Sequence, residues 1–333
     1  MTELSRRSLL VGSVATTATV LSPLAGRSPA RAAAPLSGKQ VPGFYRYMLG
    51  SFEVTVVTDG RTVSPLADIY VANQPKATVN GALDSDFLEK DKATHNYTPI
   101  VVNTGSKLVV IDTGLGLGMF AQSKGAVGQF HNNLQAAGID RNAVDTVIIS
   151  HFHGDHINGL VGPENKPAFP NAEVMVPAVE WAFWSDESNA TSKLPEIARG
   201  QVANVKRVFG VLGNKVTQYA AGKELVPGIS SVASYGHTPG HTSHIVASGN
   251  SKVLVQADIT AGMASIFLRN PEWQLAFDTD KAMAVETRKK LYEMAIAEKM
   301  PVQGFHFPFP SLGYIEKSGS GYRLIPAQWN PGL

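Results

Sequence analysis

The sequence predicts an α/β (α+β) fold in which two β-sheets pack between two layers of helices. The chain has 333 residues, of which 44% are apolar and 17% charged, and this composition suits a globular protein with a large core. Strand-like segments come in two groups along the chain, and helical stretches follow each group. Two halves of this kind bury their sheets most simply by packing sheet on sheet, with the helices outside.

The first half of the chain carries the first group of elements. Strands are expected where runs of β-branched residues are bounded by turn residues, and a helix is expected where apolar residues recur at helical spacing before a glycine. The expected elements, in order, are a linker at Ala33–Lys39, a strand at Phe52–Asp59, a hairpin over Ile100–Asp112 that turns at Asn103–Ser106, a helix at Val127–Ala137 and a buried strand at Val144–Ile149.

The second half repeats the order of strands and then helices. Its expected elements are a strand at Glu173–Val176, helices at Ala178–Trp184 and Leu194–Phe209, strands at Ser230–Ala233, Ser243–Ala247 and Lys252–Gln256, and a helix at Lys281–Lys299. The last helix has the clearest pattern, because it contains no glycine or proline and Asp278 or Asp280 precedes it as an N-terminal cap.

Residues 1–34 are predicted to be an export leader, which leaves residues 35–333 as a single domain. Ser5–Leu10 is a twin-arginine signature, Leu9–Leu21 is a short apolar region, and Ala30–Ala32 has the small residues of a cleavage site. The apolar region is short for a hydrocarbon core of ~30 Å, so no stable membrane anchor is expected. A retained anchor is the alternative. The leader predicts a periplasmic or secreted protein.

Charge and cysteine content exclude several classes of partner and ligand. The whole chain is formally +2, but residues 1–34 hold four arginines against one acid, so the remaining chain is close to neutral, at −1. No basic block remains that would indicate nucleic acid or anionic lipid as a partner. Cysteine is absent. Metal binding must therefore depend on histidine and carboxylate ligands.

The run His151-Phe152-His153-Gly154-Asp155-His156 predicts a metal site directly after a buried strand. If the chain stays extended, the period of two of a strand points His151 and His153 the same way, towards one ion. Gly154 permits a sharp change of direction, after which Asp155 and His156 can turn towards a second ion. The alternative is a histidine-rich surface loop, which would not require this ordered cluster.

This loop resembles the His-x-His-x-Asp-His loop of the metallo-β-lactamase superfamily, whose members are four-layer αββα sandwiches. Further superfamily landmarks follow the same order as in this chain. They are Thr58-Asp59-Gly60, Leu108–Gly114 with its Asp-Thr-Gly turn, Gly236–Thr242, Ala257-Asp258 and Phe305-His306. The resemblance spans roughly residues 45–325. Four further phrases resemble methyl parathion hydrolase and related exported lactonase-like enzymes: Pro42–Arg46, Leu49–Val54, Ala168–Ala172 and Gly321–Arg323.

The resemblance implies seven metal ligands. One metal would take His151, His153 and His241, the other Asp155, His156 and His306, and Asp258 would bridge the two. Two divalent ions are expected, with zinc the first choice and iron, cobalt or manganese as alternatives, because shells of histidine and aspartate accept all of these. A hydroxide bridging the metals would attack the substrate, and Asp155 would orient it or carry its proton.

Other residues receive secondary assignments. Asp59, Asp112 and His237 are candidates for groups that hold the ligands from behind, and a purely structural role is the alternative for each. His95, His131 and His244 lack companions at ligand spacing and are interpreted as surface or strand-face residues. Phe120, Trp184 and Phe267 lie in segments that flank the cleft of such folds, so they are candidates for an apolar substrate pocket, with core packing as the alternative.

The resemblance implies a hydrolase of phosphotriester (organophosphate), lactone or aryl ester bonds, with a small hydrophobic substrate. Ala261 lies three residues after Asp258, where typical acyl-homoserine lactonases have a tyrosine, and this favours the parathion-hydrolase-like branch. The alternative is that acyl-homoserine lactone cleavage, known as quorum quenching, is the main activity. A non-catalytic periplasmic metal-binding protein is a third possibility. A homodimer is expected from the resemblance alone.

Overall fold

The computed structural model describes residues 36–38, 40–186, 188–189 and 200–333. The predicted leader at 1–34, part of the predicted linker and the first six residues of the predicted helix at 194–209 lie outside the described residues. The chain divides into two compact units, Met1–Val41 and Pro42–Leu333, and the second contains every element below. Within the described part, no helix is both long and apolar enough to cross a membrane.

The first sheet has seven strands in the order β1-β2-β5-β6-β7-β8-β9. Their bounds are β1 Phe44–Leu49, β2 Phe52–Val57, β5 Ile100–Asn103, β6 Leu108–Ile111, β7 Thr146–Ile148, β8 Glu173–Pro177 and β9 Val216–Tyr219. Neighbouring strands pair antiparallel from β1 through β2 and β5 to β6, and they pair parallel from β6 through β7 and β8 to β9.

The second sheet also has seven strands, β10 to β16 in chain order. Their bounds are β10 Glu224–Val226, β11 Ile229–Ala233, β12 Thr242–Ser248, β13 Ser251–Ala257, β14 Val302–Gly304, β15 Leu312–Ser318 and β16 Gly321–Pro326. Only the β13–β14 pair of this sheet is parallel, because the helical connection between these strands returns the chain to the same end.

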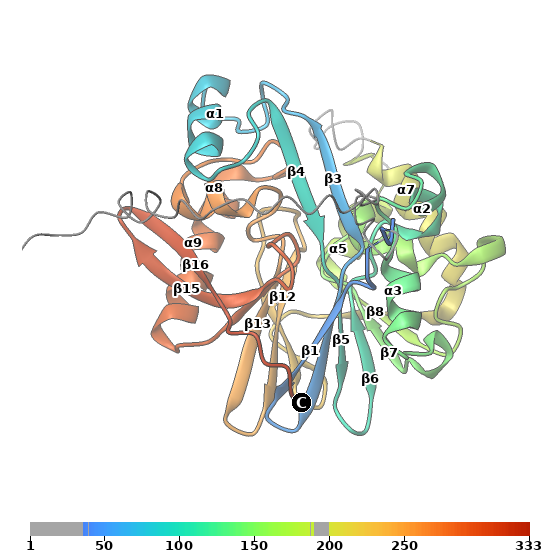
Figure 1. Ribbon diagram of the computed structural model, residues 1–333. Helices are drawn as coiled ribbons and strands as arrows, with labels where there is room; N and C mark the ends of the chain where they lie inside the picture. The colour runs from blue at the N-terminus through green and yellow to red at the C-terminus, as the bar shows by residue number, and fades with distance from the viewer. Residues whose placement is uncertain (1–35, 39, 187, 190–199) are drawn as a thin grey trace, which may run out of the picture. The chain divides into compact units, whose positions relative to one another are not determined.

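Helices cover the outer faces of the two sheets (Figure 1). On the side of the first sheet lie α2 Gly116–Gln122, α3 Phe130–Ala136, α4 Gly154–Ile157, α5 Ala178–Ser185 and α7 Gln201–Leu212. On the side of the second sheet lie α8 Ala264–Arg269 and α9 Lys281–Ala297, drawn in orange. Short 3-10 turns occur at Arg141–Ala143, Asn158–Leu160, Pro163–Asn165 and Gly213–Lys215.

Side chains of the first sheet alternate between two apolar layers, one on each face of the sheet. In β6, Val109 faces the second sheet and packs with Ile229 and Val246, whereas Val110 faces the helices and packs with Phe130 and neighbouring residues. This alternation follows from the period of two along a strand. A third layer joins the outer face of the second sheet to α9. The predicted αββα sandwich is therefore confirmed.

One part of the architecture has no counterpart in the sequence-based expectations. Strands β3 (Gly60–Pro65) and β4 (Lys92–Tyr97) form a separate two-stranded sheet, and α1 (Lys76–Ser85) connects them. This insertion has its own apolar cluster, in which Leu83 packs with Phe267 and Leu275. It stands beside the second sheet and, as shown below, supplies one wall of a cleft.

The expected elements are recovered with shifted ends. Helix α9 begins one residue after Asp280, whose side chain accepts from the Met283 amide at 3.0 Å, so Asp280 and not Asp278 is its cap. Helix α3 is shorter than predicted because Gly128 has a φ of 76° and the chain before Phe130 is a loop. Strands β1, β9, β10 and β14 to β16 were not predicted individually.

Asp59 fixes that loop through the backbone. Its Oδ2 accepts from the amide of Leu115 at 2.7 Å, and its Oδ1 accepts from the amide of Phe130 at 2.7 Å. Gly114 packs directly on the carboxylate, because a Cβ at Gly114 would overlap it. Asp59 thus has the structural role that the sequence left as the alternative: it holds the starts of α2 and α3 against the end of β2.

We expect Asp59→Ala to lower the free energy of unfolding by about 2–4 kcal/mol, because two buried or partly buried amides lose their acceptor at once. Chemical denaturation measures the change. Asp140→Ala is the matched control, since Asp140 accepts from the amide of Asn142 at an exposed site and its loss should cost about 0.5–1 kcal/mol. Equal losses for the two variants would contradict the role assigned to Asp59.

Candidate metal centre

The predicted metal loop leaves the end of β7 and turns into α4. His153 is still extended, with φ −68° and ψ 151°, and the helix begins at Gly154, so Asp155 and His156 lie on its first turn. The backbone of Gly154 is ordinary. A glycine is favoured there because a Cβ would approach the side-chain amide of Asn158 to 3.0 Å. The predicted change of direction at Gly154 is present, but a helix start causes it.

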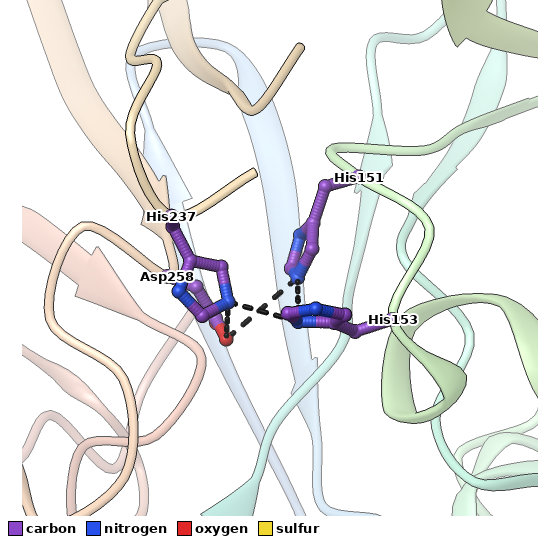
Figure 2. Close-up of side chains that lie close together, drawn as sticks. All are labelled: His151, His153, His237 and Asp258. Atoms are coloured by element: carbon purple, nitrogen blue, oxygen red, sulfur yellow. Dashed lines mark hydrogen bonds and ion pairs between the residues drawn. The ribbon is translucent and has the colours of Figure 1, made fainter. Parts of the chain in front are cut away.

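One group of ligand atoms consists of His151, His153, His237 and Asp258. Figure 2 shows the three imidazoles and the carboxylate pointing at a common centre. His153 Nδ1 lies 3.1 Å from His151 Nε2 and 2.9 Å from His237 Nε2. Asp258 Oδ2 lies 3.3 Å from His237 Nε2 and 3.8 Å from His151 Nε2.

A second group shares Asp258 and adds Asp155, His156 and His306. His156 Nε2 lies 3.2 Å from Asp258 Oδ1 and 3.5 Å from Asp155 Oδ2. His306 Nε2 lies 3.2 Å from Asp258 Oδ2 and 3.5 Å from Asp155 Oδ2. Asp258 therefore belongs to both groups, as a carboxylate that bridges two metals must.

The spacing and chemistry of these atoms fit two metal ions. Ligand atoms that each lie ~2.1 Å from a tetrahedral zinc are roughly 3.4 Å apart, close to the separations above. His156 Nε2 and Asp258 Oδ1 are buried 3.2 Å apart without forming a hydrogen bond, an arrangement that a cation bound to both would stabilise. All ligand atoms are nitrogen or oxygen, as zinc and neighbouring divalent ions accept.

The ligands differ in their protonation states. Nearby carboxylates outweigh burial and raise the pKa of His237 to about 9, and they also hold the pKa values of His156 and His306 above the ordinary value, so these three imidazoles must lose protons when a metal binds. Burial lowers the pKa of His151 well below its ordinary value and lowers that of His153 to about 3, so both imidazoles offer lone pairs at pH 7. Burial opposes ionisation of Asp258, but His306 and His156 outweigh it and hold the pKa of this carboxyl well below its usual range. Neutral imidazoles and ionised carboxylates are the forms that bind metals.

The end of β13 aims Asp258 at both groups. The register between β13 and β14 shifts between Val255 and Ala257, and Ala257 has a φ of 49°, in the left-handed region that non-glycine residues seldom occupy. This turn takes the chain out of the sheet at the residue before Asp258. The local strain is the cost of pointing the shared carboxylate into the cleft.

Acceptors behind the imidazoles fix their orientation. They are the Asp112 carboxylate for His156 Nδ1 at 2.8 Å, the Asp278 carboxylate for His237 Nδ1 at 2.8 Å and the backbone oxygen of Asn96 for His306 Nδ1 at 2.7 Å. Each bond leaves Nε2 facing the cluster. Asp112 also accepts from the amide and hydroxyl of Ser150, so it positions the whole metal loop.

His241 is not in the cluster where sequence analysis placed it, and His237 takes that position. His241 Nε2 accepts from the backbone amide of Asp258 at 3.0 Å, and its Nδ1 lies 2.8 Å from Ser234 Oγ. His241 directly precedes β12, so the sheet fixes its direction, whereas His237 lies in the loop before it and reaches the cluster. The His241 ring still lies against the cluster, with its centroid 4.9 Å from that of His151, so its role as a ligand stays a prediction.

Glu180 is an important residue that sequence analysis missed. It is fully buried and accepts from the amide of Phe152 at 3.0 Å, the amide of Gly240 at 2.8 Å and Trp184 Nε1 at 2.6 Å. Phe152 lies between two ligands of the metal loop, and Gly240 lies in the loop of His237. Glu180 thus ties the two ligand loops together. The only available signal was a single acid in an otherwise apolar helix.

A cleft of about 380 Å³ opens onto both ligand groups. Tyr70, Leu275 and Phe277 line one side, and Asn158 and Asn204 line another. His95 also faces the cleft from β4, so it is a strand-face residue with a place at the site. His244 is a buried residue of β12, which agrees with a strand-face position, whereas His131 is buried on α3, so the expectation is wrong for His131 alone.

The three aromatic residues expected in the pocket do not line this cleft. Trp184 is fully buried and donates to Glu180, because its indole N–H needs an acceptor inside the core. Phe267 is buried in the apolar cluster of the insertion, and Phe120 lies on α2. The cleft instead takes its apolar wall from the insertion and the segment around Leu275.

We expect Asp258→Ala to lose metal from both groups, because the shared carboxylate is the one ligand common to them. Metal content after dialysis, measured by plasma mass spectrometry, should fall from about two ions per chain to one or fewer. Glu286→Ala on α9 is a control that removes an acid far from the cluster. Two retained ions in the Asp258 variant would contradict the bridging position.

We expect Glu180→Gln to weaken metal binding roughly 10–100-fold and to lower unfolding free energy by about 1–3 kcal/mol. Glutamine has one acceptor oxygen, so the amide of Phe152 or of Gly240 must lose its partner. Chelator competition and chemical denaturation measure the two effects. Glu173→Gln, at an exposed position of β8, should change neither. Unaltered metal affinity in the Glu180 variant would show that the two loops do not depend on this carboxylate.

Comparison with known proteins supports the assignment of the fold and of a metal-dependent hydrolase. The model of the metallo-beta-lactamase superfamily matches residues 95–294. An N-acyl homoserine lactonase from a Bacillus species is 28% identical over 238 residues, which cover 68% of this chain and 81% of the relative. Another, from Bacillus thuringiensis, is 28% identical over 211 residues, covering 60% and 73%.

Two solved structures are similar over most of their length. The first is AidC, a dizinc quorum-quenching lactonase in complex with a product, with a TM-score of 0.78 and 27% identity over 86% of this chain and 98% of that one. The second is the hydrolase AbOPH of the beta-lactamase superfamily, with a TM-score of 0.77 and 27% identity over 88% and 100%. Together with the shared Asp258 and its histidine groups, these similarities show that the chain belongs to the metallo-β-lactamase superfamily and is a metal-dependent hydrolase.

Proposed function

We propose that this protein is a two-metal lactonase that hydrolyses N-acyl homoserine lactones. The observation that carries the proposal is Asp258, shared between two histidine-rich groups at the base of a cleft with one apolar side. The curated relatives are named N-acyl homoserine lactonases, and AidC is described as a dizinc lactonase. The comparisons therefore support this alternative better than the phosphotriesterase interpretation that Ala261 favoured.

We assign two zinc ions to the seven residues of the two groups: His151, His153 and His237 for one ion, Asp155, His156 and His306 for the other, and Asp258 for both. Bound divalent ions lower the pKa of water from 15.7 to about 7 and stabilise negative charge on a substrate oxygen. Among these ligands, Asp155 has the most exposed side chain, at 20%, so it is the carboxylate best placed to accept a proton from an attacking water.

The two sides of the cleft suit the two ends of such a substrate. Leu275, Phe277 and Ala261 offer apolar surface to an acyl chain. Asn158 and Asn204 lie on another side, where Asn204 Nδ2 donates to Asn158 Oδ1 at 2.9 Å and Arg207 donates to both side chains. This amide pair suits the polar amide and ester groups of the substrate. The volume of about 380 Å³ lies in the ordinary range for small-molecule sites.

Phosphotriester or aryl ester cleavage is the second candidate. Its support is the sequence resemblance of this chain to methyl parathion hydrolase. Both reactions build negative charge on an oxygen, so one cluster can serve both. A purely metal-binding role is opposed by the complete ligand set and the open cleft. Export through the leader predicted at residues 1–34 is part of the proposal.

A side-by-side rate assay tests the proposal. Zinc-loaded protein is given N-hexanoyl and N-decanoyl homoserine lactone, p-nitrophenyl acetate and methyl paraoxon, with His151→Ala as background. We expect the highest kcat/KM on the lactones and loss of all rates with chelator. A methyl paraoxon rate far above the others would overturn the lactonase assignment in favour of the second candidate, and absence of any metal-dependent rate would overturn both.

A further inference from the structure

The cleft contains a phenol that neither ligand group uses. Tyr70 lies between β3 and α1 and is 4% exposed. Its ring packs against Phe267 and Phe277, with ring centroids 6.3 Å away in each case. Its hydroxyl lies 2.7 Å from His95 Nε2. The ring is thus fixed by apolar contacts, and its polar end is presented on the wall of the cleft, where Tyr70 is a lining residue.

His95 connects this phenol to the metal centre. His95 lies on β4, and its ring meets the ring of His306 edge-on at a centroid distance of 6.2 Å. His306 is a member of the second ligand group. The Tyr70 hydroxyl therefore lies one side chain away from a metal ligand, on the same cleft.

Gly262 leaves room for the pair. It lies four residues after Asp258 and has a φ of +69°. A Cβ at Gly262 would overlap the Tyr70 hydroxyl and approach His95 Nε2 to 3.2 Å. The backbone that leaves the shared ligand thus passes directly against the phenol, so the position of the hydroxyl relative to Asp258 is set by main chain.

Of the two tyrosines that line the cleft, Tyr70 is the one whose hydroxyl is available to a substrate. Tyr97 also lines the cleft, but its hydroxyl lies 2.8 Å from Thr62 Oγ1, a partner within the insertion. Tyr70 has only an imidazole as its side-chain partner among the hydrogen bonds of the described chain. When that imidazole carries its proton on Nε2, it donates to the phenol oxygen and the phenol proton remains available to the cleft.

We propose that Tyr70, positioned by His95, donates its hydroxyl proton to the leaving oxygen of the substrate. This deepens the proposed function and rests on it. When the ring C–O bond of a lactone breaks, its electron pair stays on the ring oxygen, which takes the Tyr70 proton and becomes the product hydroxyl. The proton that the attacking water gave up returns to the phenolate, so the phenol is restored. Burial raises the pKa of Tyr70, which keeps it protonated before the step.

The test compares leaving groups, because a donor to the leaving oxygen matters only when that oxygen is a poor leaving group. For Tyr70→Phe, kcat on hexanoyl homoserine lactone and on ethyl hexanoate should fall on the order of 100-fold, with little change in KM. On p-nitrophenyl hexanoate, kcat should fall less than about 3-fold, since p-nitrophenolate leaves without a proton. Tyr322→Phe, which removes a partly buried hydroxyl bonded to Glu293 outside the cleft, should change none of these rates.

A second variant keeps the proposal open to refutation if Tyr70→Phe folds poorly. Gly262→Ala should displace the hydroxyl and give the same selective loss, and adding it to Tyr70→Phe should cost little more, because the atom it displaces is already gone. Metal content should stay at the wild-type value in each variant. Equal losses on all esters, or additive effects of the two changes, would overturn the proposal.

The ester pair separates this proposal from the proposed function. Wild-type protein that hydrolyses the two hexanoate esters and not the lactone would refute the lactonase assignment, while the ratio of the two ester rates would still judge Tyr70. Wild-type turnover of the lactone with no selective loss in Tyr70→Phe would refute the role of Tyr70 alone.

Discussion

The carboxylate of Asp258 is the constraint on which the site depends. It is buried among the five imidazoles of the two groups, and its two oxygens face both. A carboxylate in such surroundings needs compensating positive charge, and the imidazoles in turn need acceptors behind them to keep their lone pairs aimed inward. Asp112 and Asp278 meet that need from different halves of the chain. The two sheets must therefore pack in one register for the cluster to form.

The topology explains why the ligands meet. Strands β6 and β7 are parallel neighbours in one sheet, and β13 and β14 are parallel neighbours in the other. Asp112, His151, Asp258 and His306 follow the carboxyl ends of these four strands within three residues. Because parallel neighbours end at the same edge, each sheet delivers ligands to one edge, and face-to-face packing brings the two edges together. The remaining ligands come from loops that Glu180 joins.

The sequence was sufficient for the parts that depend on local pattern. The loop from His151 to His156 could be placed because its motif directly follows a strand, whereas Asp258 and His306 were expected from the resemblance to the superfamily. The choice between His237 and His241 could not be made from the local sequence, since both lie in one turn. The partner of His237 is Asp278, which is distant in sequence, and the partner of His241 is Ser234, which belongs to no recognisable motif. The prediction of an aromatic pocket was wrong for a similar reason. Trp184 is buried because its indole donates to Glu180, and no sequence motif identifies Glu180.

The insertion from β3 to β4 differs from the rest of the fold in how it is held. Its apolar cluster is separate from the layer between the sheets, and it contributes Tyr70, His95 and Tyr97 to the cleft but no member of either ligand group. Its contact with the metal centre includes the Asn96 backbone oxygen, which any side chain at that position preserves. Substitutions elsewhere in this wall can therefore change which substrates the cleft admits, while Tyr70, His95 and the two ligand groups keep their positions.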